Sequence, residues 1–442
     1  METLRRYLFA SLDNPLHLNG SFAIPDRRLR FHAHDVREAI LSLTSLIQYR
    51  NDQDARKRAR LVLDRIQRLT LWDGTFNAKE VAKFPLLADA RFTEQMRSPD
   101  EKIYTDRNLF NIACWTRGRW IMALCKYYRV TQDAKALELA KRFVRLVRRI
   151  SFTEDGKIHP TEFDHTHSIT GTVHGLIDYG LLVDDEEIVK HGRRIFDVGL
   201  ASVSSSYGWS VESAWGERQR PNRGEVNNTG DMIQAALLLG RSGLPEYFQD
   251  AERRIRGYLL PSQITDGGWG FPGPNDRNGG AGAGSVLDIT AGAVQALCET
   301  SLTLITRDSS GTRVNLPFTS WLGPTYVTSG LPRKWHIEVT PGQQGSLLAR
   351  IPSWAPRGNL QVTMAGQPTT PQLHGSWLAL MNVPAGTPIT VSLPLVEQTV
   401  KETVNHQPYQ LIYQGDQLVA LSPKGPSMPL FPSVEEYQGS KR

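Results

Sequence analysis

Aromatic, cationic and carboxylate side chains crowd the polar stretch Tyr207–Asp231, whose sequence is YGWSVESAWGERQRPNRGEVNNTGD. A polar loop this long inside a helical region is uncommon, and it indicates either a functional insertion or a solvated surface loop. Tryptophan and tyrosine rings cover the C–H faces of sugars, while guanidinium groups and carboxylates hold hydroxyls and move protons. The stretch therefore predicts a site for a polyhydroxylated ligand.

Hydrolysis of a glycosidic bond needs two carboxyl groups, one that protonates the leaving oxygen and one that activates water or attacks directly. The candidates are Glu212, Glu217, Glu225, Asp231 and Asp288. We predict Glu217 or Glu225 as the acid and Asp288 as its partner. Asp231 and Asp288 also stand at the starts of predicted helices, where a carboxylate complements the helix dipole. Glu217 and Glu225 also fit a solvated loop.

Further polar and aromatic side chains are predicted to bind the substrate. DHTHSITGTVH holds three histidines without HExxH spacing, so we expect hydrogen-bond donors or a proton relay there and no metal site. Trp269 lies beside a glycine-rich segment and could cover a sugar ring, or simply pack a turn. The predicted substrate-binding residues are His165, His167, His174, Tyr207, Trp209, Trp215, Arg223, Asn227 and Trp269.

The arginines of the polar stretch bear on the charge of the substrate. Arg218, Arg220 and Arg223 fall within six residues. Because arginine pairs bidentately with carboxylates, these side chains would suit a sugar acid such as a uronic-acid glycoside. Solvated surface arginines are the alternative.

Composition excludes several other classes of protein. The 442 residues carry a net charge of +6, with 40% hydrophobic and 22% charged residues. The basic segments lie at helical spacing among apolar residues, which argues against nucleic-acid binding. Three cysteines without paired spacing argue against disulfides and CxxC metal sites. The sequence shows no signal peptide and no membrane span, so we predict a cytoplasmic protein. We also expect that it binds a carbohydrate substrate and needs no cofactor. A homo-oligomer is possible.

The residue pattern changes from helical to strand-like along the chain. Apolar residues recur at spacings of three and four in helix pairs up to about residue 305, with long loops between the pairs. This pattern predicts an (α/α)6-type toroid, with an open solenoid as the alternative. Short β-branched runs divided by Pro, Gly and Asn turns follow, and they predict an antiparallel β-sandwich. We therefore expect a catalytic helical domain over 1–305 and a β-sandwich with an extended tail over 306–442.

Several segments resemble the β-L-arabinofuranosidase-like proteins, glycoside hydrolase family 127 and its relatives. LLARIPSWA and GSWLALMNVPAGTPITVSLPL are similar to that family's sandwich strands. ITGTVHGLIDYGLL, YGWSVES and WGERQRPNRGEVNNTGDMIQAALLL are similar to its inner helix, its aromatic loop and a segment with an ExC motif that opens a helix. The resemblance implies a toroid followed by a sandwich and a glycoside hydrolase activity.

The resemblance also implies a thiolate nucleophile on zinc, and there the chain departs from the family. The ExC glutamate falls on Glu225 and its cysteine on Asn227, the family's adjacent cysteine pair falls near Leu287–Asp288, and its acid/base glutamate falls on Glu217. Because an amide supplies no thiolate ligand, a sulfur-rich zinc site is not expected. We therefore predict a divergent member that works with carboxylates.

Two other functions remain open. A polysaccharide lyase or epimerase on the same toroid would use Tyr207, His174 and Arg223. A non-catalytic carbohydrate-binding or scaffold protein would fit the loss of the family's cysteines, although the carboxylate-rich loop favours an enzyme.

Overall fold

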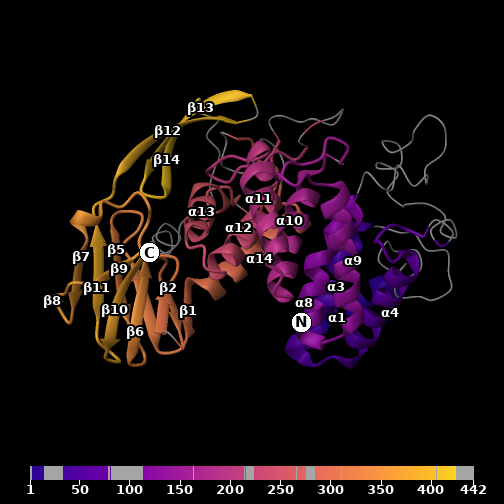
Figure 1. Cartoon of the computed structure of the whole chain (residues 1–442), viewed down its shortest axis with the longest axis horizontal. Helices are drawn as coiled ribbons and strands as arrows, with labels where there is room; N and C mark the ends of the chain where they lie inside the picture. Colours follow the sequence, from indigo (N-terminus) through magenta and orange to yellow (C-terminus); the bar gives the residue numbers. More distant parts are fainter. Residues whose placement is uncertain are drawn as a thin grey trace. The chain divides into compact units, whose positions relative to one another are not determined.

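The computed structural model describes residues 2–13, 33–77, 80, 113–162, 164–213, 215, 223–264, 266–274, 284–309, 311–404 and 406–424. Its contacts divide the chain into two compact units, unit 1 (Met1–Ser202) and unit 2 (Val203–Arg442). In Figure 1 unit 1 runs from indigo to magenta and unit 2 continues to yellow. Helices give way to strands at Leu304 and Ile305. The predicted domains, 1–305 and 306–442, stay a prediction.

In the described part of unit 1, amphipathic helices pack beside a helix that is buried along most of its length. The elements are α1 (Glu2–Asp13), α3 (Ala33–Arg50), α4 (Gln53–Leu69), the π-helical turn η1 (Cys114–Gly118), α8 (Trp120–Thr131), α9 (Ala134–Ile150), α10 (Thr166–Leu182), α11 (Glu186–Arg194), and the turns η2 (Ile195–Gly199) and η3 (Leu200–Ser202). In α9 the Asp133 side chain accepts from Lys135 N at 3.1 Å and so caps the helix. Its buried face includes Phe143 and Val147, while Lys141 is exposed.

Helix α10 differs from α9 because every residue from Thr166 to Gly180 is buried. It packs against α8 on one side and α11 on another. Gly175 allows the close approach to α8, since a Cβ there would lie 3.0 Å from Met122 N. A buried inner helix beside amphipathic outer helices is what an (α/α) toroid requires.

Unit 2 repeats this arrangement before its strands begin. Its helices are α12 (Val226–Arg241), α13 (Glu246–Arg254), the π-helical turn η4 (Ile255–Leu259) and α14 (Leu287–Leu304). Every residue of α12 from Val226 to Gly240 is buried, and α12 packs against α13 and α14. The predicted fold class, a helical toroid followed by a β part, is confirmed, whereas the six-hairpin count stays a prediction. Within the described ranges no helix is long and apolar enough to cross a membrane.

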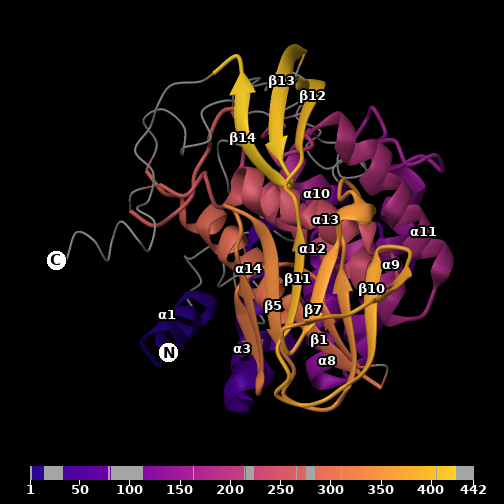
Figure 2. The ribbon, with the colours of Figure 1, turned by 90° about the vertical axis from the view of Figure 1, so that its left-hand side faces the viewer.

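The strands of unit 2 form three sheets, which Figure 2 shows in orange and yellow. Five strands pair in the order β1-β2-β6-β10-β9, six in the order β3-β4-β5-β11-β7-β8, and three in the order β12-β13-β14. Their bounds are β1 (Ile305–Asp308), β2 (Gly311–Val314), β3 (Ser320–Leu322), β4 (Thr325–Ser329), β5 (Trp335–Thr340), β6 (Gly345–Arg350), β7 (Gln361–Met364), β8 (Gln367–Pro368), β9 (Gln372–His374), β10 (Trp377–Val383), β11 (Ile389–Leu393), β12 (Glu397–Val404), β13 (Gln407–Gln414) and β14 (Gln417–Ser422), with a 3₁₀ turn η5 (Arg357–Asn359).

Among the strands that the structure describes, the pairing is antiparallel except at one place. Strands β2 and β6 run parallel, with Arg313 opposite Leu348. The chain leaves β2, builds β3, β4 and β5 in the other large sheet, and returns as β6. Such a long crossover permits a parallel pair, which a hairpin turn does not. The predicted antiparallel β part is confirmed, and this one parallel pair lies within it.

A buried charge network joins the helices of unit 2 to the five-stranded sheet. Arg256 Nε lies 2.8 Å from Glu252 Oε1, and Arg350 pairs with the other oxygen of the same carboxylate. Arg350 Nε also donates to Asn315 O at 2.7 Å. Because all three charged side chains are buried, removing one would leave an uncompensated charge in the interior.

Candidate functional site

The described part of the predicted aromatic stretch lies in unit 2, where two isolated bridges involve it. Ser204 pairs with Ser210, and Val211 pairs with Gly224. Tyr207 and Trp209 are 0% and 1% exposed. Trp209 Nε1 donates to Pro272 O at 3.0 Å, and the Tyr207 hydroxyl donates to Pro274 O. Both aromatic side chains are thus tied to the backbone of residues 272–274. Their role as sugar platforms stays a prediction.

Glu225 stands directly before α12 and is 5% exposed. Asn227 Nδ2 donates to Glu225 Oε1 at 3.4 Å, and the Glu225 side chain makes no capping bond to the helix. A carboxylate at a helix N-terminus is stabilised by the helix dipole, and a donated hydrogen bond adds to that. Burial of the carboxyl opposes its ionisation, so these effects act in opposite directions, and the catalytic role of Glu225 stays a prediction.

Arg223 and Glu212 form an ion pair beside the Val211–Gly224 bridge. Arg223 Nε lies 2.7 Å from Glu212 Oε2, and Glu212 N donates to Arg223 O at 2.8 Å. The Arg223 guanidinium also lies 3.6 Å from the centre of the Phe271 ring. Binding of an anionic substrate by Arg223 would compete with this pair, so that role stays a prediction.

The remaining residues predicted in this region fall in different settings. Asp231 is buried within α12, whereas Asp288 is exposed in the first turn of α14. Trp215 is half-buried. Trp269 is buried, and its indole N–H donates to Leu259 O at 2.7 Å, which ties the end of η4 to the loop before α14. Glu217, Arg218 and Arg220 lie outside the residues that the structure describes.

The start of α10 in unit 1 gathers cationic side chains. His167 Nε2 lies 3.0 Å from Arg37 Nη1, and His167 Nδ1 lies 3.2 Å from Arg119 Nη2. All three side chains are buried. A guanidinium group only donates, and a neutral imidazole accepts at one nitrogen alone. The cluster Arg37–His167–Arg119, called here the basic cluster, thus gathers two guanidinium groups around one imidazole, and Arg37 Nε also lies 3.5 Å from Glu38 Oε1.

The other predicted histidines also belong to α10. His165 precedes the helix, its Nδ1 lies 2.8 Å from Ser168 Oγ, and its ring packs edge-on against Trp115 at 4.7 Å between centroids. His174 is buried two turns further along the helix. The structure thus brings His165 and His167 together at one helix end and places His174 deeper.

Further charged groups lie close to η1. Glu162 is buried and accepts from Cys114 N at 3.3 Å. Arg117 is buried over the Phe76 ring at 4.3 Å, and burial lowers the pKa of its guanidinium to about 10. The sequence analysis missed Arg37, Arg119 and Glu162. Two arginines inside the apolar run ACWTRGRWIMAL are the signal that could have found one of them.

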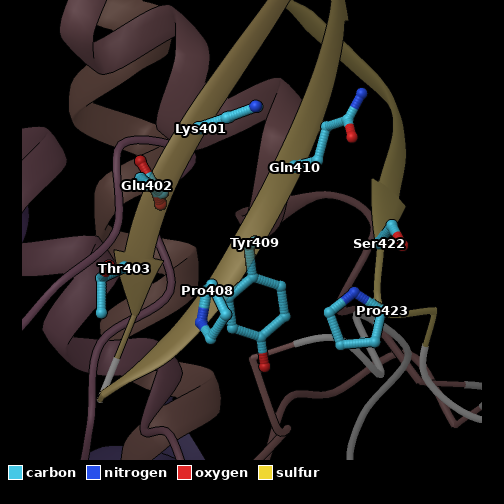
Figure 3. A pocket seen from close by; sticks show the side chains of 8 residues that line it. All are labelled: Lys401, Glu402, Thr403, Pro408, Tyr409, Gln410, Ser422 and Pro423. Atoms are coloured by element: carbon cyan, nitrogen blue, oxygen red, sulfur yellow. The ribbon is translucent and has the colours of Figure 1, made fainter.

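A second carboxyl that the sequence analysis missed is Glu402, which lines the cavity in Figure 3. The cavity measures about 460 Å3 and lies on the three-stranded sheet of unit 2. Ser206 N lies 3.3 Å from both Glu402 oxygens, and Ser206 Oγ lies 3.1 Å from the Tyr413 hydroxyl. Burial raises the pKa of the Glu402 carboxyl. The cavity is lined by Lys401, Glu402, Thr403, Pro408, Tyr409, Gln410, Ser422 and Pro423.

The zinc site that the resemblance implies does not fit the donor set. Asn227 offers an amide in place of a thiolate, and Cys298 lies well beyond Leu287–Asp288 along α14. Cys114 and Cys125 are buried, and burial raises the pKa of both thiols well above the ordinary value. In the described part of the chain no three His, Cys, Asp or Glu side chains are placed to hold a metal ion.

Comparison with known proteins adds a family to this geometry. Residues 17–192 match the family model described as "Beta-L-arabinofuranosidase, GH127 catalytic domain". The predicted resemblance to the β-L-arabinofuranosidase-like glycoside hydrolases is confirmed. The match lies within unit 1 and includes His165 and His167, but it ends before Glu225. The chain therefore falls among the glycoside hydrolases, as predicted.

Solved structures of family 127 enzymes are similar to this chain in fold. A family 127 β-arabinofuranosidase aligns with a TM-score of 0.57 at 17% identity, covering 94% of this chain and 79% of its own. A family 127 β-L-arabinofuranosidase from Geobacillus stearothermophilus T6 aligns with a TM-score of 0.55 at 13% identity, covering 93% of this chain and 82% of its own. A search of curated proteins found no match.

Proposed function

We propose that this glycoside hydrolase cleaves its substrate with carboxyl groups rather than with a zinc-bound thiolate. The observation that supports this most is Glu225, which is buried at the start of α12 beside Asn227 where the family pattern has a cysteine. Glu225 acts as the base or nucleophile. Glu217, which the resemblance assigns as acid/base, is the proposed acid, and Asp288 is the reserve candidate.

We further propose a sugar acid as the substrate class. The basic cluster holds two buried guanidinium groups within 3.0 and 3.2 Å of one imidazole, and such groups bind carboxylates strongly. The substrate is taken as a free carbohydrate, without nucleic acid, membrane or added cofactor. A lyase or epimerase acting on the same sugar acids, and a non-catalytic binding protein, are the rival functions.

Kinetics on chelator-treated protein tests the mechanism. Aryl uronides and neutral aryl glycosides are the substrates, and the variants are Glu225→Gln, Glu225→Ala and the exposed control Glu397→Gln. We expect turnover to survive chelation, to collapse in both Glu225 variants and to persist in the control. Azide should restore part of the Glu225→Ala activity if Glu225 is the nucleophile, because a small anion replaces the missing carboxylate.

Several results would overturn the proposal. Activity that returns only with added zinc would restore metal chemistry. New double-bond absorbance from a uronate polymer would identify a lyase. Sugar-induced stabilisation without turnover would identify a binding protein. Equal efficiency on uronides and neutral glycosides would remove the sugar-acid part of the proposal and leave the hydrolase.

A further inference from the structure

A cavity of about 530 Å3 lies at one end of the six-stranded sheet in unit 2. Its size falls within the roughly 300–1,000 Å3 range of small-molecule sites. The lining combines polar groups with the apolar surface of Leu360, Leu393 and Pro394. The polar lining residues are Lys334, His336, Asn359, Gln361 and Ser392.

Strand register places three of these polar side chains in one row. Ser392 on β11 stands opposite His336 on β5 and opposite Gln361 on β7. His336 Nδ1 lies 2.8 Å from Ser392 Oγ. The neighbouring cross-strand pair, Trp335 opposite Leu393, is buried in the sandwich core. Because side chains alternate between the two faces of a strand, the row lies on the opposite face from the core.

The only formal charge that the lining residues carry at neutral pH is positive. Lys334 adds an ammonium group at the end of β5, and no lining residue carries a carboxylate. Glu338 lies on the same face two residues further along β5, outside the lining. Lys334 has no salt bridge to any carboxylate in the described ranges. An ammonium, an imidazole, a hydroxyl and two carboxamides are the donors that an anionic, hydroxyl-rich ligand needs.

We propose that this cavity is a second, non-catalytic binding site for a sugar acid. Lys334 pairs with the ligand carboxylate, while the His336–Ser392–Gln361 row and Asn359 bind its hydroxyl groups. Leu360 and Pro394 cover an apolar face of the sugar ring. The site shares its ligand class with the proposed function, and its occupancy does not depend on turnover.

Hydrogen exchange on the full chain locates the ligand. D-glucuronic acid is the probe, glucose is the neutral comparison, and Lys334→Met is tested beside the exposed control Lys57→Met. We expect glucuronic acid to slow exchange in β5, β7 and η5, with about tenfold or greater loss of affinity in Lys334→Met and none in Lys57→Met. Glucose should bind equally to all three proteins. Gln361→Ala, which keeps the charge, should weaken both sugars.

The outcomes separate this site from the catalytic one. Unchanged protection of β5 and β7 at saturating glucuronic acid, or equal affinity in Lys334→Met and the parent chain, would overturn the proposal. Hydrolysis of aryl uronides should stay within twofold of the parent rate in Lys334→Met. If the protection is seen while no substrate is turned over, this inference stands and the proposed hydrolase fails. Unchanged melting temperatures of the variants exclude unfolding as the cause.

Discussion

Helices α10 and α12 are both buried along nearly their whole length, yet their first turns gather opposite groups. The start of α10 holds the basic cluster, in which His167 lies between Arg37 and Arg119. The start of α12 holds Glu225 with Asn227 as its donor. Both helices have helix N-termini that attract anions, so the dipole does not distinguish them. The neighbouring side chains do, because guanidinium groups lie at the start of α10 and a carboxyl group lies at the start of α12.

The largest effect is expected from the carboxylate of α12. Replacing Glu225 with glutamine should lower kcat roughly 10²- to 10⁴-fold, because the amide cannot act as a base or nucleophile. Steady-state kinetics on an aryl uronide measures this, with circular dichroism to confirm folding. A variant that keeps its parent kcat would show that α12 supplies no catalytic carboxylate and would end the contrast with α10.

The next effect concerns the basic cluster of α10. Replacing His167 with leucine removes the ring that faces the Arg37 and Arg119 donors, and we expect a loss of about 1–3 kcal/mol in the free energy of unfolding. His167→Gln keeps an acceptor and should lose less. Urea denaturation measures both variants. If leucine is tolerated as well as glutamine, the imidazole does not organise the two arginines.

Glycines test what the two helices have in common. A Cβ at Gly230 of α12 would lie 2.8 Å from Gly292 O, and one at Gly175 of α10 would lie 3.0 Å from Met122 N. Each alanine variant should therefore lose roughly 1–3 kcal/mol in the free energy of unfolding. Gly358→Ala is the control, since nothing lies within 4 Å of its Cβ position. Damage in only one of the two helices would show that they are packed differently.

The smallest effect is a pH dependence of opposite sign in the two units. Burial lowers the pKa of His191 in unit 1, where Nδ1 accepts from Arg148 Nε and Nε2 lies 3.0 Å from Thr153 O. The unfolded chain then binds the proton more tightly, so stability is complete above pH 6.5 and falls as the pH drops through the lowered pKa. Burial raises the pKa of Glu402 in unit 2, so the folded chain holds its proton longer and stability falls as the pH rises above 4.5.

Variants separate these two titrations. Glu402→Gln should remove the fall above pH 4.5, and His191→Gln should remove the fall below pH 6.5. Urea unfolding between pH 4 and 8 measures both slopes. Slopes of the same sign in the two variants would contradict the assignment.

Local periodicity was enough to predict several elements of this fold. Apolar residues at spacings of three and four predicted the helices, and short β-branched runs between turns predicted the strands. The parallel pairing of β2 with β6 was not predicted, because the residue pattern of a strand does not specify which other strand it pairs with. Fold class and enzyme class therefore followed from the sequence, while sheet topology did not.

The contacts of the candidate site residues were harder to predict, because the partners within each unit come from distant positions in the sequence. Arg37 and His167 are 130 residues apart, and Ser206 and Glu402 are 196 residues apart. No motif spacing links such pairs, and Glu402 reads in the sequence as one polar residue of an edge strand. Glu225 was found because it lies within the polar stretch, but its role depends on Asn227 and on the helix that begins between them.

The buried network of Glu252, Arg256 and Arg350 limits how this chain can be recombined. Cutting where the strands begin, at residue 305, would keep Glu252 and Arg256 but discard the arginine that shares the same carboxylate. A foreign sandwich joined there would need its own cation at the place of Arg350, and an acceptor for it like Asn315 O. The last helices and the sandwich are thus exchangeable only as one piece, and a successful graft would have to begin near Val203 rather than at the change from helix to strand.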